Sequence, residues 1–379
     1  MKILLIKLFN VGMMVLYTPL KYLPVNKHKV VFLSRQSNEV NLDFRLIQHS
    51  LKKKNKKIKI INLCKRCDNG IRDYIVFTWY LLKSLYHLAT ANVCVLDSYW
   101  PAVSMLKHKK NLTVIQIWHA MGKIKQSGYQ SLGRAGGRDA KVAHAMAMHK
   151  NYDIIIAGGK SWNPFYCQSF GTRESTLLNC GLPRMDYLLQ MEKKTKEKIL
   201  KVYPEFSEKT VLLYAPTFRR GWEAHWEELA QCIDFERYIL ILKSHPNQKL
   251  DKVAKEVYTC DEFKAVDLLT VCDYLITDYS AIAVEGAVLN KKTYYYVYDY
   301  DEYDEKNGLN INLFETMPGC VFRNAKDLTI ALERYTYPQE MLDEYRKKYL
   351  PEKLGVSTKT ISNIIIEKMG KSDENYEIS

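Results

Sequence analysis

Short apolar runs of strand length recur along this chain and alternate with segments of helical spacing. Strands that alternate with helices favour a parallel sheet with helices on both faces. The predicted strands fall at 29–34, 57–63, 93–96, 113–118 and 152–157 in the first half, and at 210–215, 238–243, 274–277 and 292–297 in the second. A chain of 379 residues is also too long to fold around one ordinary hydrophobic core. The two series therefore predict two Rossmann-like α/β domains, at 29–187 and 188–379, after a leading segment at 1–28.

Positive charge is concentrated in the first half of the chain. The formal net charge is +14, and residues 1–150 contain 26 Lys and Arg against 6 Asp and Glu. A basic region of this size attracts either nucleic acid or an anionic membrane surface. The apolar segments beside it favour the membrane, so a nucleic-acid partner is not predicted.

The first 24 residues form an apolar stretch that is interrupted by Lys7, Asn10 and Gly12 and closed by Pro19 and Pro24. A helix that crosses a bilayer needs about 20 uninterrupted apolar residues, and no small-residue cleavage site of a signal peptide follows. These features predict a membrane-associating helix that lies at the surface or re-enters it, with lysines on the lipid phosphates. We therefore expect peripheral attachment to the cytoplasmic face of the cell membrane.

A second region has the same character. A basic run at 52–59 precedes an aromatic-rich helical pattern at 77–88, which indicates a second membrane contact. The alternative is a solvated helix end followed by a core helix.

Cysteine and glycine patterns argue against several classes of protein. Nine Cys at irregular spacings, without a secretion signal, are typical of reduced thiols. The single C-x-x-C, formed by Cys64 and Cys67, has no second ligand pair, so no metal site is predicted. The chain lacks G-x-x-x-x-G-K-[ST] and lacks G-x-G-x-x-G directly after a strand. A P-loop kinase and an NAD enzyme are therefore not expected, and no cofactor is predicted.

One predicted strand of the first half ends on Trp118 and His119, and Gly122, Lys123 and Lys125 follow it. Open α/β sheets bind their ligands at the carboxyl ends of the strands. An imidazole, with an unperturbed pKa of about 6.5, can take up a proton at physiological pH. His119 is therefore the candidate general base and Lys123 a candidate ligand of an anion. The alternative is a core histidine packed on Trp118.

Two predicted strands of the second half end on polar side chains. A proline stops the first of them and delivers Thr217 and Arg219, a hydroxyl and a guanidinium that suit a phosphate. The second ends on Lys243, Ser244 and His245. His245 is the candidate for a hydrogen bond to a diphosphate or for protonation of a departing phosphate. The alternatives are a solvated turn and a structural histidine.

A third strand runs into Thr277, Asp278 and Ser280, and then into a helix rich in small residues. Ser280 can cap this helix, whose exposed N–H groups and positive dipole end suit a phosphate. Asp278 either orients a neighbouring Lys or His or only satisfies backbone donors. Glu285 either reaches a ribose hydroxyl or is a solvated helix residue.

Together these segments resemble the motif set of the CDP-glycerol glycerophosphotransferase family, which includes the teichoic acid glycerophosphate and ribitolphosphate transferases. The motifs, in family order, are Trp118-His119 followed by Gly-Lys, Gly181-Leu-Pro-Arg-Met-Asp186, Ala215-Pro-Thr-Phe-Arg219, Lys243-Ser-His-Pro246 and Thr277-Asp-Tyr-Ser280. The resemblance implies a GT-B-like α/β fold, with two Rossmann-like domains facing a central cleft and an N-terminal membrane-associating helical segment. It also implies transfer of a polyol phosphate from CDP-glycerol or CDP-ribitol to a hydroxyl of an undecaprenyl-diphosphate-linked glycan acceptor. CMP is released, and the product is teichoic acid or a related cell-surface polymer.

The resemblance also implies roles for individual residues. His119 and His245 take the catalytic positions, whereas Thr217, Arg219, Asp278 and Ser280 fall in the donor site. Glycerol phosphate is the first expectation, but the acidic segment 298–308 stands where many members carry Arg-Gly, so the polyol stays open. That segment is predicted to be a solvated loop rather than a Mg²⁺ site. Two other functions stay open, a GT-B glycosyltransferase that uses a nucleotide sugar and a non-enzymatic binder of nucleic acid or lipid.

Overall fold

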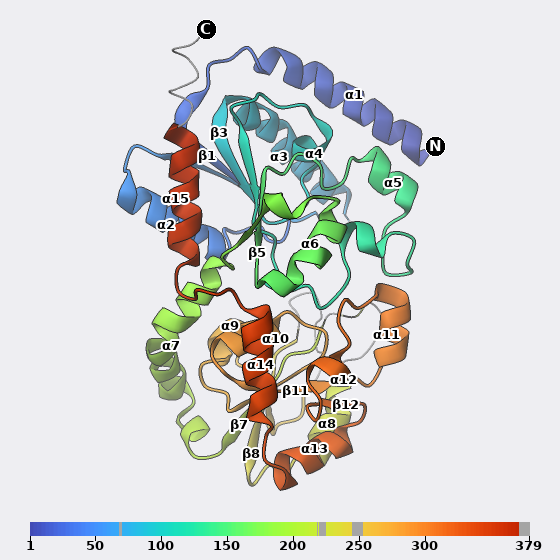
Figure 1. Cartoon of the computed structure of the whole chain (residues 1–379), viewed down its shortest axis with the longest axis vertical. Coiled ribbons are helices and arrows are strands. Elements are labelled where there is room, and N and C mark those ends of the chain that lie inside the picture. Colours follow the sequence, from blue (N-terminus) through green and yellow to red (C-terminus); the bar gives the residue numbers. More distant parts are fainter. Residues whose placement is uncertain (68–69, 218, 220–224, 245–252, 371–379) are drawn as a thin grey trace. The chain divides into compact units, whose positions relative to one another are not determined.

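The computed structural model contains two parallel β-sheets of six strands each (Figure 1). It describes residues 1–67, 70–217, 219, 225–244 and 253–370. The chain divides into two compact units. Unit 1 comprises Met1–Met121, Ser127–Arg184 and the segment from Val356 onward, and unit 2 comprises Gly122–Gln126 and Met185–Gly355.

The sheet of unit 1 is parallel and has its topological switch between two central strands. In spatial order its strands are β2 (Lys59–Cys64), β1 (Asn26–Ser34), β3 (Ala91–Leu96), β4 (Thr113–Gln116), β5 (Ile154–Ala157) and β6 (Leu177–Asn179). The chain continues from β1 toward one edge and from β3 toward the other. The carboxyl ends of β1 and β3 therefore flank the switch point, where open sheets bind ligands.

Seven α-helices are described in unit 1. They are α1 (Lys2–Leu20), α2 (Leu42–Lys54), α3 (Ile71–Thr90), α4 (Pro101–Met105), α5 (Ala140–Ala145), α6 (Asn163–Phe170) and α15 (Ser357–Gly370). Helix α2 shows why such segments form: Asn41 caps its first turn by accepting from the Phe44 N–H at 2.8 Å. Phe44, Ile47 and Leu51, three and four residues apart, are buried on one face.

The sheet of unit 2 is also parallel. In spatial order its strands are β12 (Val321–Phe322), β11 (Lys292–Tyr296), β10 (Tyr274–Thr277), β7 (Thr210–Tyr214), β8 (Tyr238–Leu242) and β9 (Val257–Tyr258). This is the strand order 3-2-1-4-5-6 of a Rossmann sheet read from β9, so the switch point lies between β7 and β10.

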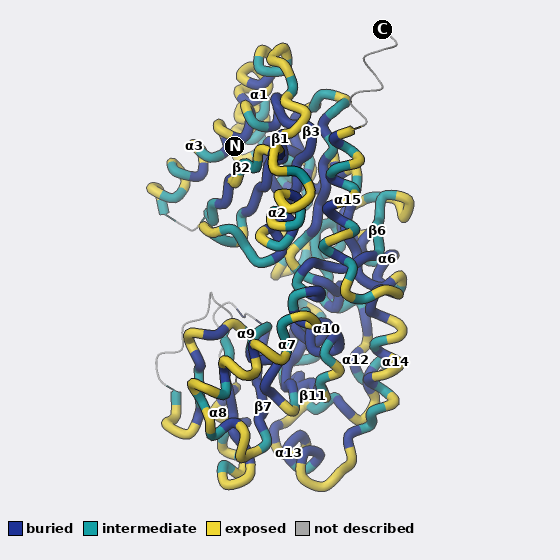
Figure 2. The backbone as a smooth tube through the Cα atoms, turned by 90° about the vertical axis from the view of Figure 1, so that its left-hand side faces the viewer, coloured by how far each residue is buried: buried dark blue, intermediate teal, exposed yellow. Residues whose placement is uncertain are grey.

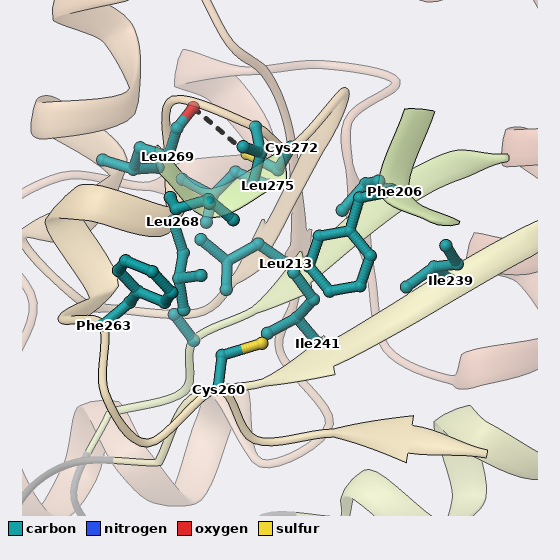
Figure 3. Close-up of a cluster of buried hydrophobic side chains, with 14 of the residues drawn as sticks. Phe206, Leu213, Ile239, Ile241, Cys260, Phe263, Leu268, Leu269, Cys272 and Leu275 are labelled. Atoms are coloured by element: carbon teal, nitrogen blue, oxygen red, sulfur yellow. Dashed lines mark hydrogen bonds between the residues drawn. The ribbon is translucent and has the colours of Figure 1, made fainter. Parts of the chain in front are cut away.

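The described helices of unit 2 cover this sheet. They are α7 (Pro183–Val202), whose first two residues belong to unit 1, α8 (Trp226–Cys232), α9 (Ala265–Leu268), α10 (Ile282–Val288), α11 (Tyr300–Asn307), α12 (Leu313–Thr316), α13 (Ala325–Arg334) and α14 (Gln339–Tyr349). One face of the sheet supplies Leu213, Ile241 and Leu275 to a core that includes Phe206 and Leu268 (Figure 3). Because side chains alternate along a strand, these residues share a face.

The central strands are buried, whereas the outer helix α1 is mostly exposed (Figure 2). Strand β3 is buried along its whole length, whereas much of α1 is exposed. Helix α1 lies along the outside of unit 1 against α3 and α5 (Figure 1). It buries only Met13 and Tyr17, and the Tyr17 hydroxyl lies 2.8 Å from His108 Nδ1.

The structure confirms the predicted strands and the two-sheet α/β fold, with differences at short elements. Strands β6, β9 and β12 were not predicted, because two or three residues at a sheet edge carry no periodic pattern. The acidic segment 298–308, predicted to be a loop, contains helix α11. Helix α15 packs in unit 1, although the predicted second domain runs to residue 379. The domain ranges themselves stay a prediction, because compact packing does not test which segments fold independently.

Candidate functional site

Asp97 is the buried centre of the switch point in unit 1. It follows β3, is 1% exposed, and accepts hydrogen bonds from Ser34 Oγ at 2.8 Å, Asn41 Nδ2 at 2.7 Å and Ser98 Oγ at 2.9 Å. Burial raises the pKa of Asp97 to about 6, and the bonds from Ser34, Ser98 and Asn41 act in the opposite direction. Asp97 was not predicted from the sequence, although a polar side chain directly after a buried strand is the signal that predicted the other site residues.

His119 lies beside Asp97 and is held through one ring nitrogen. Trp118, which precedes it, has a φ of +58° and donates its N–H to Gln116 Oε1 at 2.8 Å. This left-handed residue turns the chain after β4. His119 Nδ1 then lies 3.1 Å from the carbonyl oxygen of Asp97. A carbonyl only accepts, so Nδ1 carries the proton and Nε2 carries the lone pair.

The contact between Gln36 and the His119 ring agrees with this tautomer in only one orientation of the Gln36 side-chain amide. The amide nitrogen of Gln36 is placed 3.3 Å from Nδ1. Amide oxygen and nitrogen atoms are assigned from the hydrogen-bond network, and a protonated Nδ1 requires the Gln36 oxygen on this side. The ring lies against Trp118, tilted by 34° with 4.3 Å between centroids, but His119 is exposed. The alternative of a core histidine is therefore wrong.

Residues 122–126 leave unit 1 and join unit 2. Lys125 forms an antiparallel bridge with Leu309, and Asn310 Nδ2 donates to the Lys123 carbonyl at 2.8 Å. Lys123 itself is 2% exposed, and burial lowers its pKa to about 7. Its predicted contact with substrate stays a prediction.

Lys125, which was named only as part of the loop, reaches the switch point of unit 2. Its Nζ lies 3.5 Å from Thr217 Oγ1, at the end of β7. Burial lowers the pKa of Lys125, Asp278 acts to raise it, and Arg219 acts to lower it. The ammonium group thus lies among the predicted donor-site residues.

Arg219 is paired with two carboxylates in the same place. It donates from Nη1 to Asp278 at 2.6 Å, and from Nε and Nη2 to Asp299 at 2.7 and 3.0 Å. Asp278 also accepts from the Thr217 N–H at 2.9 Å. Burial acts to lower the pKa of Arg219, but Asp278 and Asp299 raise it overall. These donors are already engaged, so the guanidinium shapes the loop that carries Thr217, and its direct contact with phosphate stays a prediction.

Aromatic rings surround this guanidinium. Tyr298, Tyr303 and Tyr279 lie 4.8, 5.6 and 5.8 Å from its central carbon. The Tyr279 hydroxyl donates to Asp299 at 3.0 Å. Cation–π contacts of this kind add to an ion pair. Asp299 and the tyrosines of the acidic segment are thus part of a buried network, which the sequence analysis did not predict.

The remaining predicted residues take varied positions. Thr277 donates to the Ala215 carbonyl at 2.7 Å, a bond within the sheet. Lys243 Nζ donates to two backbone carbonyls at 3.1 and 2.9 Å. Ser280 lies 3.5 Å from the Ile282 N–H. Glu285 is 5% exposed, so its alternative as a solvated residue is wrong.

Two of the predictions concern residues that the structure does not test. Ser244 is partly buried at the end of β8. His245 lies outside the described residues. The substrate roles of both stay predictions.

One family motif is structural within unit 1. Arg184 donates to the buried Asp43 from its backbone N–H at 2.8 Å and from Nε at 2.9 Å. The pair joins the start of α7 to the first turn of α2. Among the described residues, His, Cys, Asp and Glu form no group of three or more that could hold a metal ion.

Two parallel sheets, each with polar side chains gathered at its switch point, define a GT-B-like α/β protein. The structure is similar to that of the wall teichoic acid polymerase TagF, with a TM-score of 0.75 and 18% identity over 98% of this chain and 99% of that one. The model of the CDP-glycerol:poly(glycerophosphate) glycerophosphotransferase family matches residues 15–367. The chain therefore belongs to this family of teichoic acid polyol-phosphate transferases.

Curated relatives include both primases and polymerases. The chain is 27% identical to a teichoic acid ribitol-phosphate primase of Bacillus spizizenii, over 90% of this chain and 92% of the relative. It is 30% identical to a teichoic acid glycerol-phosphate primase of Bacillus subtilis, over 66% and 67%. It is 28% identical to a teichoic acid poly(ribitol-phosphate) polymerase of Bacillus spizizenii, over 92% of this chain but only 58% of the relative's length.

Proposed function

We propose that the chain transfers a polyol phosphate from a CDP-polyol to a hydroxyl of an undecaprenyl-diphosphate-linked acceptor and releases CMP. Glycerol phosphate is the first choice, and ribitol phosphate is the alternative. The observation that carries the proposal is the exposed His119 at the end of β4, whose Nδ1 is held by the Asp97 carbonyl. The family to which the chain belongs supports the class of donor.

The proposed reaction is an in-line displacement at the phosphorus bonded to the polyol. His119 Nε2 takes the proton of the acceptor hydroxyl as its oxygen forms the new bond to phosphorus. The bond from phosphorus to the CMP phosphate breaks, and CMP leaves with the electron pair. Positioning and electrostatic stabilisation supply most of the rate in phosphoryl transfer. His245 is assigned, as a prediction, to a hydrogen bond with the donor diphosphate or to protonation of the departing CMP phosphate.

We assign the donor phosphates to the switch point of unit 2. Lys125 and the Thr217 hydroxyl lie 3.5 Å apart there and supply a cation and a neutral donor. Arg219 and Asp278 fix the loop, because both bond to Thr217, through its carbonyl at 3.0 Å and its N–H at 2.9 Å. Ser280, at the start of the turn before α10, is assigned to the same group of phosphates.

We assign the acceptor's lipid to a membrane surface that unit 1 contacts peripherally, on its cytoplasmic side. Helix α1 is 19 residues long and is long and apolar enough to cross a membrane by length and composition. It nevertheless packs through Met13 and Tyr17 on the unit, which favours a helix that lies on the surface. Most of its exposed side chains are apolar, and Val15 is 67% exposed.

Val15→Glu is expected to weaken binding to anionic vesicles at least tenfold, because a carboxylate replaces an apolar side chain that would insert between lipids. Cosedimentation with vesicles measures this. The matched control is Val202→Glu, the same change at a 51% exposed position of α7 in unit 2. Equal binding by both variants would show that α1 does not contact the bilayer.

The donor is identified by incubating the purified chain and a lipid-linked acceptor with CDP-glycerol, CDP-ribitol or UDP-sugars in turn. We expect CMP release from one CDP-polyol, dependent on acceptor. Release of UDP from a UDP-sugar, with both CDP-polyols inert, would replace the proposal by a glycosyltransferase reaction.

A further inference from the structure

Arg35 follows β1 at the switch point of unit 1, beside the candidate base. Its backbone N–H donates to Ser98 Oγ at 3.0 Å. Ser98 donates to the carboxylate of Asp97, whose carbonyl holds His119. The next residue, Gln36, contacts the His119 ring. Arg35 and His119 therefore occupy the same carboxyl edge of one sheet.

The guanidinium of Arg35 has no anionic partner among the described residues. It lies over the ring of Phe77 at 5.1 Å, and its Nε is buried without a hydrogen bond. None of the ion pairs within the described ranges includes it. Burial lowers the pKa of Arg35, and Arg138 lowers it further. A guanidinium stays charged in proteins, and a half-buried charge whose Nε is buried without a partner is costly. A bound anion would remove that cost.

Arg138 belongs to a glycine-rich turn that the proposed reaction does not otherwise use. Gly133 has a φ of +79° and donates its N–H to the Arg138 carbonyl at 3.1 Å. A Cβ at Gly137 would lie 1.7 Å from the Ser131 carbonyl oxygen. The turn therefore requires glycine at both positions. Burial raises the pKa of Tyr99, and Arg35 and Arg138 both act to lower it, so the charges of the two arginines act on the same tyrosine.

The helix that carries Phe77 has an apolar outer face. Ile71, Tyr74, Ile75 and Trp79 of α3 recur at three- and four-residue spacing, and all are more than half exposed. Phe77 faces inward on the same helix and contacts Arg35. Helix α3 therefore presents an apolar stripe outward and supports an unpaired guanidinium on its inner side.

We infer that Arg35 and Arg138 bind a phosphate group of the acceptor and so hold the acceptor hydroxyl at His119. This inference rests on the proposed function. The fork of a guanidinium matches two phosphate oxygens, and two arginines suit a diphosphate better than one. The apolar stripe of α3 takes the first part of the lipid chain. Apolar contact, charge and base then follow one another along unit 1, in the order of the lipid, the diphosphate and the glycan hydroxyl of the acceptor.

The test uses two soluble acceptors with the same glycan, one linked to a short alkyl diphosphate and the other to the alkyl group alone. For Arg35→Gln we expect KM for the diphosphate acceptor to rise at least tenfold, with donor KM unchanged. Activity on the alkyl glycoside should not change. Arg35→Lys keeps the charge but not the fork, and Arg138→Gln removes the exposed partner, so both should show smaller losses. Equal losses on the two acceptors, or a raised donor KM, would overturn the inference.

A direct measurement separates this inference from the proposed function. Binding of inorganic pyrophosphate to the full chain is measured by calorimetry with the donor site saturated by CMP. We expect Arg35→Gln to weaken it at least tenfold and Arg35→Met, which keeps an apolar contact with Phe77, to weaken it equally. Arginine-dependent binding by a chain that transfers no polyol phosphate would leave the inference standing and remove the function. Unchanged pyrophosphate binding in both variants, with normal polyol-phosphate transfer, would overturn the inference and leave the proposed function standing.

The source of the phosphate and the specificity of the effect need their own controls. Arg173→Gln removes an exposed arginine that precedes β6, at the opposite edge of the sheet, and should behave as the unchanged chain. Cosedimentation with anionic vesicles should be the same for Arg35→Gln and the unchanged chain. If Arg35→Gln instead loses vesicle binding and keeps its KM for the soluble diphosphate, the phosphate is that of a lipid headgroup and the acceptor assignment is overturned.

Discussion

His119→Ala is expected to lower kcat by roughly 10²- to 10⁴-fold, the usual contribution of a general base. The reason is the geometry of one ring, in which the Asp97 carbonyl holds Nδ1 and leaves the lone pair on Nε2. Binding of the CDP-polyol should be largely kept, because the donor site is assigned to unit 2. Single-turnover rates and donor binding, measured on the same protein, separate the two effects.

A histidine elsewhere and a pH series sharpen this test. His49→Ala, at an exposed position of α2, should leave turnover unchanged. The base works as neutral imidazole, so kcat should fall as pH drops through its pKa, and this acid limb should be absent from the residual activity of His119→Ala. Burial raises the pKa of Asp97 to about 6, so the titration of Asp97 has to be distinguished from that of the base. Asp97→Asn keeps the backbone carbonyl and should keep the limb. Full turnover in His119→Ala with the limb unchanged would show that another group takes the proton.

The sequence predicted the strands and their polar ends because both depend on local pattern. Apolar runs are buried wherever a parallel sheet forms, and ligand groups gather at its carboxyl edge. This rule found His119, Thr217 and Asp278, and it would have found Asp97 had it been applied after β3. The short strands β6, β9 and β12 gave no such signal, since their pairing depends on neighbours far along the chain.

Long-range packing decided the rest of the site. The two lysines after His119 look alike in sequence, yet one is buried and the other reaches Thr217. The difference depends on pairing with Leu309, which lies far along the chain. Similarly, nothing local distinguishes Asp299 from the other carboxylates of the acidic segment. Its burial depends on Arg219, eighty residues earlier in the chain.

Asp278→Ala is expected to destabilise unit 2 by about 3–5 kcal/mol, the usual cost of removing one partner of a buried ion pair. Arg219 would keep Asp299 but lose the 2.6 Å bond to Asp278, and the Thr217 N–H would lose its acceptor. Urea unfolding and hydrogen exchange of peptides covering 210–217 and 274–280 measure the loss.

Arg219→Lys, which cannot reach both carboxylates as a fork, should also lower donor use by about tenfold or more.

A double-mutant cycle shows whether this loss is that of a pair. Arg219→Met is made alone and in the Asp278→Ala background. Each single variant breaks the 2.6 Å bond between Arg219 and Asp278, and the double variant breaks it only once, so the double variant should lose less stability than the sum of the two single losses. Asp301→Ala is the matched control, because Asp301 pairs with Arg323 at 2.6 Å on the exposed surface of α11. Solvent screens such a pair, and the unfolding midpoint should not move. If instead Asp278→Ala unfolds like Asp301→Ala, the network around Arg219 does not stabilise the loop. Thr217 would then be positioned by the sheet alone, and Arg219→Lys should use the donor normally.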